Sequence, residues 1–199
     1  MQKYMIKVHT LSDIMFGSGQ SIPEVIDNDI RYDECGLPYM NAKTLKGHLR
    51  EKMEFVKFFR DEYKDVDIDH LLGGSNPLNS MNGILKFSDL GLSPNIQLVI
   101  KKAISEGKLT ANEVLDSLTI TYSSTKINEE GVAEDHSLRR ERMIKKGITF
   151  FSILYSEEDL TAKELSLLIT ALSAIQHLGT HKSKGKGVVL CELEGVTAK

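Results

Sequence analysis

An apolar stripe between residues 45 and 63 constrains the fold of this chain more than any other sequence feature. Its members recur at three- and four-residue steps, the spacing of one face of an α-helix: Leu45, Leu49, Met53, Val56, Phe59 and Tyr63. Such a helix needs a second layer of structure against which to bury that face. The turn sequence Gly36-Leu37-Pro38 precedes the stripe, so the sequence predicts a turn, a short extended segment and then a long helix that ends near Tyr63.

Basic residues gather in the first two turns of this predicted helix. Lys43, Lys46 and Arg50 lie on a face beside the apolar stripe, where positive charge opposes the helix dipole. A bound phosphate would explain this arrangement, since free N–H groups and cations together form an anion site; a solvated basic face is the alternative. Gly47 costs about 1 kcal/mol relative to alanine inside a helix, which indicates that another group approaches closely there.

The remaining apolar patterns predict a mixed α+β chain. Strand-like stretches cover residues 3–11, 83–90, 118–122, 147–155 and 188–193, and further helices start at the capping boxes Thr110–Glu113 and Thr161–Glu164. The core order of strand, helix, strand, strand, helix and strand is that of the ferredoxin-like (RRM-like) split βαβ fold. Inserts then fall between the first strand and the first helix, and between the second and third core strands.

Composition limits the classes of function. The formal net charge is −3, so the chain is not a globally basic nucleic-acid binder, and any such role depends on local patches. The two cysteines, Cys35 and Cys191, are far apart and form no zinc-binding pair, which fits a reducing cytoplasm. We expect a cytoplasmic location and no membrane contact, because no apolar run suits a signal peptide or approaches the roughly 18 residues of a membrane span.

A glycine- and lysine-rich loop is predicted at residues 179–187, between the second core helix and the last strand. Its cationic side chains alternate with small residues: His181, Lys182, Lys184 and Lys186. Glycines let a phosphate approach the backbone, while ammonium and N–H groups supply the charge that holds it. We therefore predict phosphate contact here, against the alternative of a plain flexible connection between helix and strand.

Residues 123–146 form the least regular region, which we predict to be an exposed hairpin or loop. They hold few apolar residues and a basic cluster that includes Arg139, Arg140 and Arg142. Contact with a polyanion that orders the segment is one interpretation, and a solvated hairpin is the other. If nucleic-acid bases meet this segment, small aliphatic side chains such as Ile127 or Val132 must insert between them.

Asp27, Asp29 and Asp33 form a tight carboxylate group near these basic elements. In an extended segment, Asp27 and Asp29 point to the same side and could share a divalent cation, which would stabilise a phosphodiester during displacement. Turn-forming aspartates are the alternative. His48, on the long helix, could contact RNA, although a plain surface histidine is the simpler explanation.

Taken in order, these motifs resemble the RAMP superfamily of CRISPR-associated proteins, and most of all the repeated backbone subunit of type III (Csm/Cmr-like) effector complexes. The resemblance spans nearly the whole chain. It rests on Phe16-Gly17-Ser18-Gly19, Ile26-Asp27, Asp33–Tyr39, Thr44–Arg50 and the loop at 179–187. It implies a single domain of residues 1–199, with a ferredoxin-like palm (residues 1–122 and 147–199) and an inserted β-hairpin thumb (residues 123–146).

The resemblance also implies partners and a reaction in antiviral defence. Copies of the subunit stack along a guide (CRISPR) RNA beside other effector subunits, the basic clusters grip the guide backbone, and the thumb kinks the guide–target duplex. In target-cleaving members, the cleavage aspartate lies six positions before the first aspartate of an Asp-x-x-Gly-x-Pro-like turn. In this sequence that turn begins at Asp33, and Asp27 lies six positions before it. Asp27 is thus the implied catalytic and metal-binding residue of an endoribonuclease that uses Mg²⁺ or Mn²⁺ to cleave target RNA through the RNA's own 2′-hydroxyl.

Three other functions stay open at this point. The chain could be a catalytically inactive structural RNA-binding subunit, with its aspartates in turns. It could be a stand-alone, metal-independent ribonuclease that processes guide RNA with His48 or His181. A ferredoxin-like regulator that binds a small molecule is the remaining alternative, but it leaves the basic clusters without a purpose.

Overall fold

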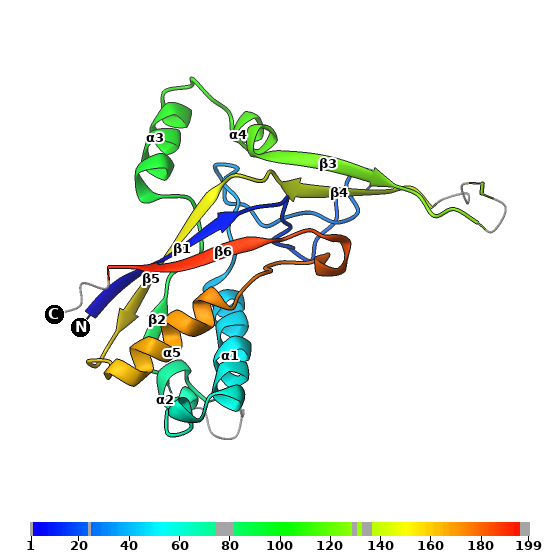
Figure 1. Ribbon diagram of the computed structural model, residues 1–199. Coiled ribbons are helices and arrows are strands. Elements are labelled where there is room, and N and C mark those ends of the chain that lie inside the picture. The colour runs from blue at the N-terminus through cyan, green and yellow to red at the C-terminus, as the bar shows by residue number, and fades with distance from the viewer. Residues whose placement is uncertain (1, 24, 75–81, 129–130, 133–136, 196–199) are drawn as a thin grey trace.

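Four antiparallel strands form the main sheet of the computed structural model, in the order β2-β5-β1-β6 (Figure 1). The structure describes residues 2–23, 25–74, 82–128, 131–132 and 137–195. Its strands are β1 (Gln2–Thr10), β2 (Leu85–Phe87), β3 (Thr119–Ser124), β4 (Arg139–Ile144), β5 (Thr149–Ser156) and β6 (Val189–Glu194). Its helices are α1 (Ala42–Phe59), α2 (Ile68–Leu72), α3 (Pro94–Ser105), α4 (Ala111–Leu118) and α5 (Ala162–Ser173), with 3₁₀ turns η1 (Asp61–Tyr63) and η2 (Lys182–Lys184). This strand order, with α1 between β1 and β2 and α5 between β5 and β6, confirms the α+β, ferredoxin-like prediction.

β1 lies inside the sheet and pairs with both of its neighbours over most of its length. It runs antiparallel to β5 from Gln2↔Ser156 to His9↔Thr149, and to β6 from Met5↔Glu194 to Thr10↔Val189. Alternate side chains of β1 are buried: Tyr4, Ile6, Val8 and Thr10. Their cross-strand partners include Leu154 and Phe150, which belong to the same core face of the sheet.

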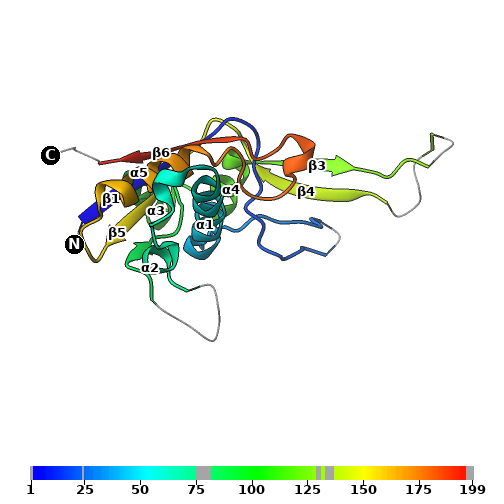
Figure 2. The same cartoon turned by 60° about the horizontal axis from the view of Figure 1, so that its bottom comes forward.

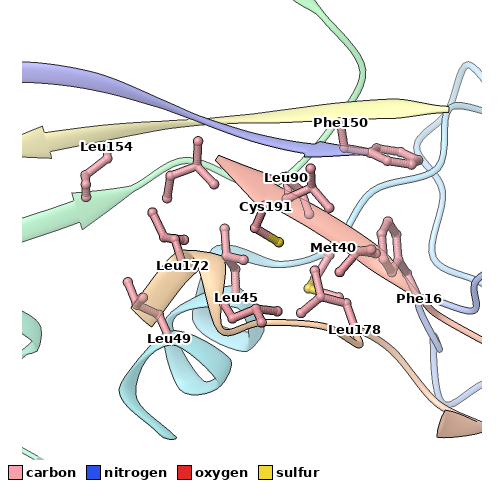
Figure 3. Close-up of a cluster of buried hydrophobic side chains, with 14 of the residues drawn as sticks. Phe16, Met40, Leu45, Leu49, Leu90, Phe150, Leu154, Leu172, Leu178 and Cys191 are labelled. Atoms are coloured by element: carbon pink, nitrogen blue, oxygen red, sulfur yellow. The ribbon is translucent and has the colours of Figure 1, made fainter. Parts of the chain in front are cut away.

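The main core lies between this sheet and the helix pair α1 and α5. Figure 3 shows Leu45 and Leu49 of α1 and Leu172 of α5 on the side of the sheet that Leu154 and Cys191 face. Figure 1 shows α3 and α4 on the opposite side of the sheet. The sheet is therefore covered by long helices on one face and by a thinner layer on the other.

The apolar stripe on α1 is confirmed for four of its six positions and differs at its end. Leu45, Leu49, Met53 and Val56 are the buried residues of this helix. Phe59 was predicted to continue the buried face, but 66% of its surface is exposed. The reason is that the chain leaves helical geometry at Arg60, where φ is −126° and ψ is 109°, so η1 and not α1 carries the buried Tyr63.

Both predicted capping boxes are present and set where α4 and α5 begin. At α5, the Glu164 N–H donates to the Thr161 hydroxyl at 3.3 Å, and the Thr161 N–H donates to the Glu164 carboxylate at 2.8 Å. Thr110 and Glu113 make the same reciprocal pair at α4. Among the helices of the described segments, none is both long enough and apolar enough to cross a membrane.

β3 and β4 form a separate two-stranded sheet, which Figures 1 and 2 show projecting away from the main sheet. Its register runs from Thr119↔Ile144 to Ser124↔Arg139. The strand-like stretch at 118–122 thus belongs to this hairpin and not to the main sheet. The predicted palm and thumb boundaries stay predictions, and residues 129–130 and 133–136 of the predicted thumb lie outside the described residues.

Candidate functional site

The segment that carries Asp27 lies along the first residues of β4, near the Ser124↔Arg139 end of the hairpin ladder (Figure 2). The Asp27 N–H donates to the Arg140 carbonyl at 2.8 Å, and the Arg140 N–H donates to Oδ2 of Asp27 at 2.7 Å. Asn28 continues this contact as a parallel bridge to Glu141. The Asp27 side chain is exposed, and its Oδ1 accepts no hydrogen bond from the described residues. Asp27 is thus held in place by one carboxylate oxygen and presents the other to solvent.

The two neighbouring aspartates have partners within the fold. Asp29 is only 5% exposed. Its Oδ1 accepts a hydrogen bond from the Ile30 N–H at 2.8 Å and lies 3.4 Å from a guanidinium nitrogen of Arg142. Asp33 accepts from the N–H groups of Cys35 and Leu37, both at 2.9 Å, as the turn interpretation expects. Asp27 and Asp33 therefore each keep one carboxylate oxygen that accepts no hydrogen bond from the described residues, and Asp27 is the more exposed of the two.

The donor set around Asp27 is small and fits a cation that takes most of its ligands from outside the protein. Within the described ranges, no three His, Cys, Asp or Glu side chains gather as a metal-binding group. Mg²⁺ commonly keeps several waters and binds through one or two carboxylates together with substrate phosphates. One free oxygen of Asp27 meets that requirement, so a metal role for Asp27 stays a prediction that the geometry permits.

Four predicted RNA-binding cations have partners inside the fold: Lys46, Arg50, Arg142 and Lys186. The Lys46 ammonium donates to the Leu72 carbonyl at 3.0 Å. Arg50 lies 2.6 Å from a carboxylate oxygen of Asp69 and also donates to the Gly73 carbonyl. These two α1 side chains therefore tie α1 to the C-terminal end of α2, where helix carbonyls are otherwise unpaired.

Lys186 belongs to a polar cluster at the base of the hairpin. Its ammonium lies 3.3 Å from Oδ2 of Asp13 and 4.0 Å from the centre of the Tyr122 ring, and the Tyr122 hydroxyl donates to Asp13 at 2.5 Å. Burial alone would raise the pKa of Asp13, but hydrogen bonds from Tyr122, Lys146 and Lys186 outweigh it and lower that pKa. Asp13 thus stays ionised and binds the glycine- and lysine-rich loop to β3.

Five predicted RNA-binding cations present their charge to solvent: Lys43, Arg139, Arg140, Lys182 and Lys184. Their side chains form no ion pair with any part of the chain that the structure describes. Arg139 and Arg140 begin β4, and Lys182 and Lys184 begin and end η2. Arg139 and Arg140 adjoin the contact with Asp27, and Lys182 and Lys184 follow His181, which contacts Glu141; Lys43 lies apart from them, at the start of α1.

His181 joins the glycine- and lysine-rich loop to β4. Its Nε2 lies 3.3 Å from Oε1 of Glu141, which is 8% exposed and also accepts from the Asn28 amide at 2.9 Å. His181 adopts a left-handed conformation with φ of 63°, which is unusual for a residue other than glycine. The Asp27 segment, β4 and the loop at 179–187 therefore meet around one buried carboxylate.

His48 lines a pocket of about 260 Å³ between the start of α1 and the segments that contain Gly17 and Thr180. Burial lowers the pKa of His48, and the positive charge of Lys182 lowers it further. The side chain is therefore neutral at pH 7 and available for hydrogen bonding but not as a cation. This position places His48 beside Gly179 and Thr180 of the loop at 179–187, and its contact with RNA stays a prediction.

Open surface lies above Gly47, beside the predicted basic face. A Cβ placed at Gly47 would meet nothing within 4 Å. Gly47 lines a cleft of about 570 Å³ together with Lys43, Lys46 and Lys86. No group of the described chain approaches Gly47 closely, so the close approach that we predicted there would have to come from a ligand.

Sequence reasoning missed Asp13, Asn28, Tyr122 and Glu141, which hold the site together. Each of them bonds to a residue that is far away in the sequence, such as Asp13 to Tyr122 and Asn28 to Glu141. Glu141 stands among arginines, in the segment for which the sequence predicts an exposed hairpin or loop. The one available signal was its place at an alternate position of a strand-like run, which puts its side chain opposite those of its neighbours.

Comparisons with known proteins agree with this architecture. The model of the RAMP superfamily matches residues 7–190. A chain of the type III-B Cmr-beta complex bound to cognate target RNA is similar over 97% of each chain, with 16% identity and a TM-score of 0.69. A chain of the apo state of that complex is similar over 98% of each chain, with 16% identity and a TM-score of 0.70. A chain of a type IV-B CRISPR complex is similar over 100% of this chain and 92% of its own, with 14% identity and a TM-score of 0.64. A comparison with curated proteins found no match.

Proposed function

Because the chain belongs to the RAMP superfamily, we propose that it is a guide-RNA-binding backbone subunit of a type III CRISPR effector complex, and that it cleaves bound target RNA. The observation that carries the proposal is the position of Asp27. Its exposed carboxylate lies beside the first residues of β4, bonded to the backbone of Arg140, with solvent-facing cations on β4 and η2. The similar chains come from the type III-B Cmr-beta complex, which supports the assignment to type III. One of these complexes is bound to target RNA, which supports target RNA as a ligand.

Guide RNA would bind where solvent-facing cations are available. Arg139, Arg140, Lys182 and Lys184 supply charge on both sides of the contact between His181 and Glu141. Lys43 and the open surface over Gly47 would form a second, separate contact region at the start of α1, beside α2 and β2. Phosphate contacts of this kind are independent of sequence, as a subunit that accepts any guide requires.

Hydrophobic side chains on the hairpin would meet the bases. Ile127, Val132 and Leu138 expose 65%, 59% and 53% of their surfaces. Water-exposed aliphatic groups near the end of a projecting hairpin are suited to insert between base steps, which unstacks them and bends the duplex. The hairpin thereby supports the proposed role as a wedge in the guide–target duplex.

The proposed reaction is attack by a target-strand 2′-hydroxyl on the adjacent phosphodiester. The 2′-oxygen forms a bond to phosphorus, the bond from phosphorus to the 5′-oxygen breaks, the 2′-hydroxyl loses its proton and the 5′-oxygen gains one. Oδ1 of Asp27 would hold Mg²⁺ or Mn²⁺, which when bound stabilises negative charge on the phosphate. Arg140 stands beside Asp27 and would contribute a fixed positive charge, while the hydrogen bond from its N–H keeps the carboxylate from rotating.

Two variants of Asp27 test the proposal in the assembled complex. Asp27→Asn keeps an oxygen for the Arg140 N–H but removes the charge, whereas Asp27→Ala removes both. We expect both variants to bind guide RNA and assemble like the wild type, and to lose target cleavage. EDTA should stop the wild-type reaction, and added Mg²⁺ or Mn²⁺ should restore it.

The outcomes separate the alternatives. Continued cleavage by an assembled Asp27→Ala complex would contradict the catalytic assignment. A wild-type complex that binds a complementary target with Mg²⁺ and leaves it intact would favour an inactive structural subunit. Cleavage of guide precursor by the isolated protein in EDTA would favour a stand-alone ribonuclease that depends on His48 or His181.

A further inference from the structure

Three phenylalanines form an exposed aromatic surface at the C-terminal end of α1. Phe55, Phe58 and Phe59 expose 56%, 78% and 66% of their surfaces. Their rings are in contact, with centroids 4.8 Å apart for Phe55 and Phe59 and 5.0 Å apart for Phe58 and Phe59. An exposed aromatic cluster of this kind marks an interaction surface, because single exposed apolar residues are common whereas contiguous ones are not. We call these three residues the phenylalanine patch.

A second apolar surface lies on α3. None of its twelve residues is buried, and Ile96, Leu98 and Val99 expose 47%, 70% and 67% of their surfaces. Ile100 and Ile104 are the residues of α3 that pack against the core, on its other side. A helix of twelve residues is marginally stable without tertiary packing, so α3 gains from a partner on its outer face.

The two surfaces have opposite charge. The segment from Glu51 to Asp69, which surrounds the phenylalanine patch, contains seven acidic and four basic residues. The segment from Pro94 to Lys108 contains three lysines and one glutamate, and Glu106 lies within ion-pair distance of Lys102 and Lys108, which leaves Lys101. Lys101 on α3 is exposed and has no ion pair within the described residues, and Glu51 beside the patch is also exposed. Charge of opposite sign around two apolar surfaces fixes the orientation of their contact and disfavours the contact of each surface with itself.

We propose that the phenylalanine patch of one copy binds the outer face of α3 in a second copy of this chain. Figure 1 shows α1 and α3 on opposite sides of the main sheet, so one copy uses both surfaces at once, each with a different neighbour. Such a contact joins two different surfaces, so it does not pair two copies symmetrically, and it produces a linear stack when the rotation between neighbours does not close a ring. The inference rests on the proposed role as a repeated backbone subunit and names the surfaces that join the repeats.

Charge also argues against RNA as the occupant of the phenylalanine patch. Stacking of bases on aromatic rings is usual in single-strand binding, but it is accompanied by a basic groove that follows the phosphates. Around this patch the cations are occupied: Lys52 pairs with Glu51, Arg60 with Glu62, and Lys64 with Asp61. The patch therefore suits a protein surface with a basic rim better than a polyanion.

Cysteine cross-linking tests the contact directly. Phe58→Cys and Leu98→Cys place thiols at exposed positions, while the native Cys35 and Cys191 are buried. We expect a short bifunctional maleimide to link the two variants when they are mixed, and to link neither variant to itself. Leu190→Cys is the matched control, because Leu190 is 50% exposed on β6, outside both surfaces, and should not link to Phe58→Cys. Each mixture is examined alone and with polyuridine RNA long enough for several copies.

Charge exchange and a measured affinity complete the test. Phe58→Ser should weaken association by about 30-fold, the effect of losing one central aromatic contact. Lys101→Glu should also weaken it, and pairing that variant with Glu51→Lys should restore part of the loss. Self-linking of Phe58→Cys, linking through Leu190→Cys, or no linking with or without RNA would each overturn the proposal. These variants should bind a short oligonucleotide, which holds a single copy, as tightly as the wild type does. If the wild type itself fails to bind RNA, that result counts against the proposed function and not against this contact.

Discussion

Nε2 of His181 lies 3.3 Å from Oε1 of Glu141, although one residue belongs to the loop after α5 and the other to β4. Because Oε1 of Glu141 also accepts from the Asn28 amide, this carboxylate holds the Asp27 segment and the glycine- and lysine-rich loop on the same strand. The segments that carry the proposed cleavage residue and two proposed guide-binding lysines therefore share one buried side chain as an anchor, in addition to the hydrogen bonds between Asp27 and Arg140.

Glu141→Ala should destabilise the protein and also impair cleavage. The change removes the acceptor of the Asn28 amide and the carboxylate that faces His181. Because both partners are partly open to solvent, we expect a loss of about 0.5–1.5 kcal/mol of unfolding free energy. Urea unfolding measures this loss. Glu141→Gln is the control, since it keeps an acceptor for Asn28 and removes the negative charge that faces His181. If Glu141→Ala unfolds like the wild type, the carboxylate does not hold these segments together.

The salt dependence of RNA binding should separate the exposed cations from the paired ones. Removing Lys182 or Arg139 should lower the slope of log K against log salt by roughly 0.7, the contribution of one phosphate contact with a single strand. Arg50→Met should leave that slope nearly unchanged, because Asp69 already balances the charge of Arg50. Fluorescence anisotropy with a guide-length RNA at several salt concentrations provides the measurement. Equal slope changes in all three variants would remove the distinction between exposed and paired cations.

Two glycine substitutions should act in opposite directions on stability. Gly47→Ala should stabilise the fold by about 0.5–1 kcal/mol, because the site is an exposed helix interior with no atom within 4 Å of the new Cβ. Gly36→Ala should destabilise it by more than about 1 kcal/mol, because φ is +76° and the Cβ would lie 2.1 Å from the Ala111 carbonyl oxygen.

The same Gly47 variant tests whether RNA reaches α1. If a ribose or phosphate lies against Gly47, the added methyl group should weaken RNA binding in a protein that is more stable than the wild type. Thermal melting and RNA titration of one preparation give both values. Unchanged affinity would exclude close contact at Gly47 and would leave Lys43 as a peripheral charge.

Stability should fall as the pH drops below about 6.5, and His48 should account for part of the loss. Burial and Lys182 hold the pKa of folded His48 below its ordinary value of 6.5, although Glu51 opposes them. The unfolded chain therefore takes up a proton at higher pH than the folded chain, so acid favours unfolding between those two pKa values. Melting temperatures of the wild type and His48→Gln across this range measure the contribution. The variant has no such proton to bind, so an identical pH dependence in both proteins would show that His48 does not titrate as described.

Local patterns in the sequence predicted the elements and most of their boundaries. The stripe from Leu45 to Val56 sets α1, and the capping boxes at Thr110 and Thr161 set the first turns of α4 and α5. These predictions succeed because helix faces and caps depend on residues three or four positions apart. Phe59 was misread for the same reason: its spacing fits the stripe, but the helix ends there and the side chain faces solvent.

The sequence by itself determined the order of core strands and helices, the positions of the basic clusters and the spacing that singles out Asp27. Only the tertiary structure decided which charges are free. Lys186 and Lys184 lie in one loop, yet the fold pairs Lys186 with Asp13 and leaves Lys184 exposed. The physical reason is that a side chain's available charge depends on partners that come from distant parts of the chain, and those partners are fixed when the sheet, the hairpin and the loops pack together.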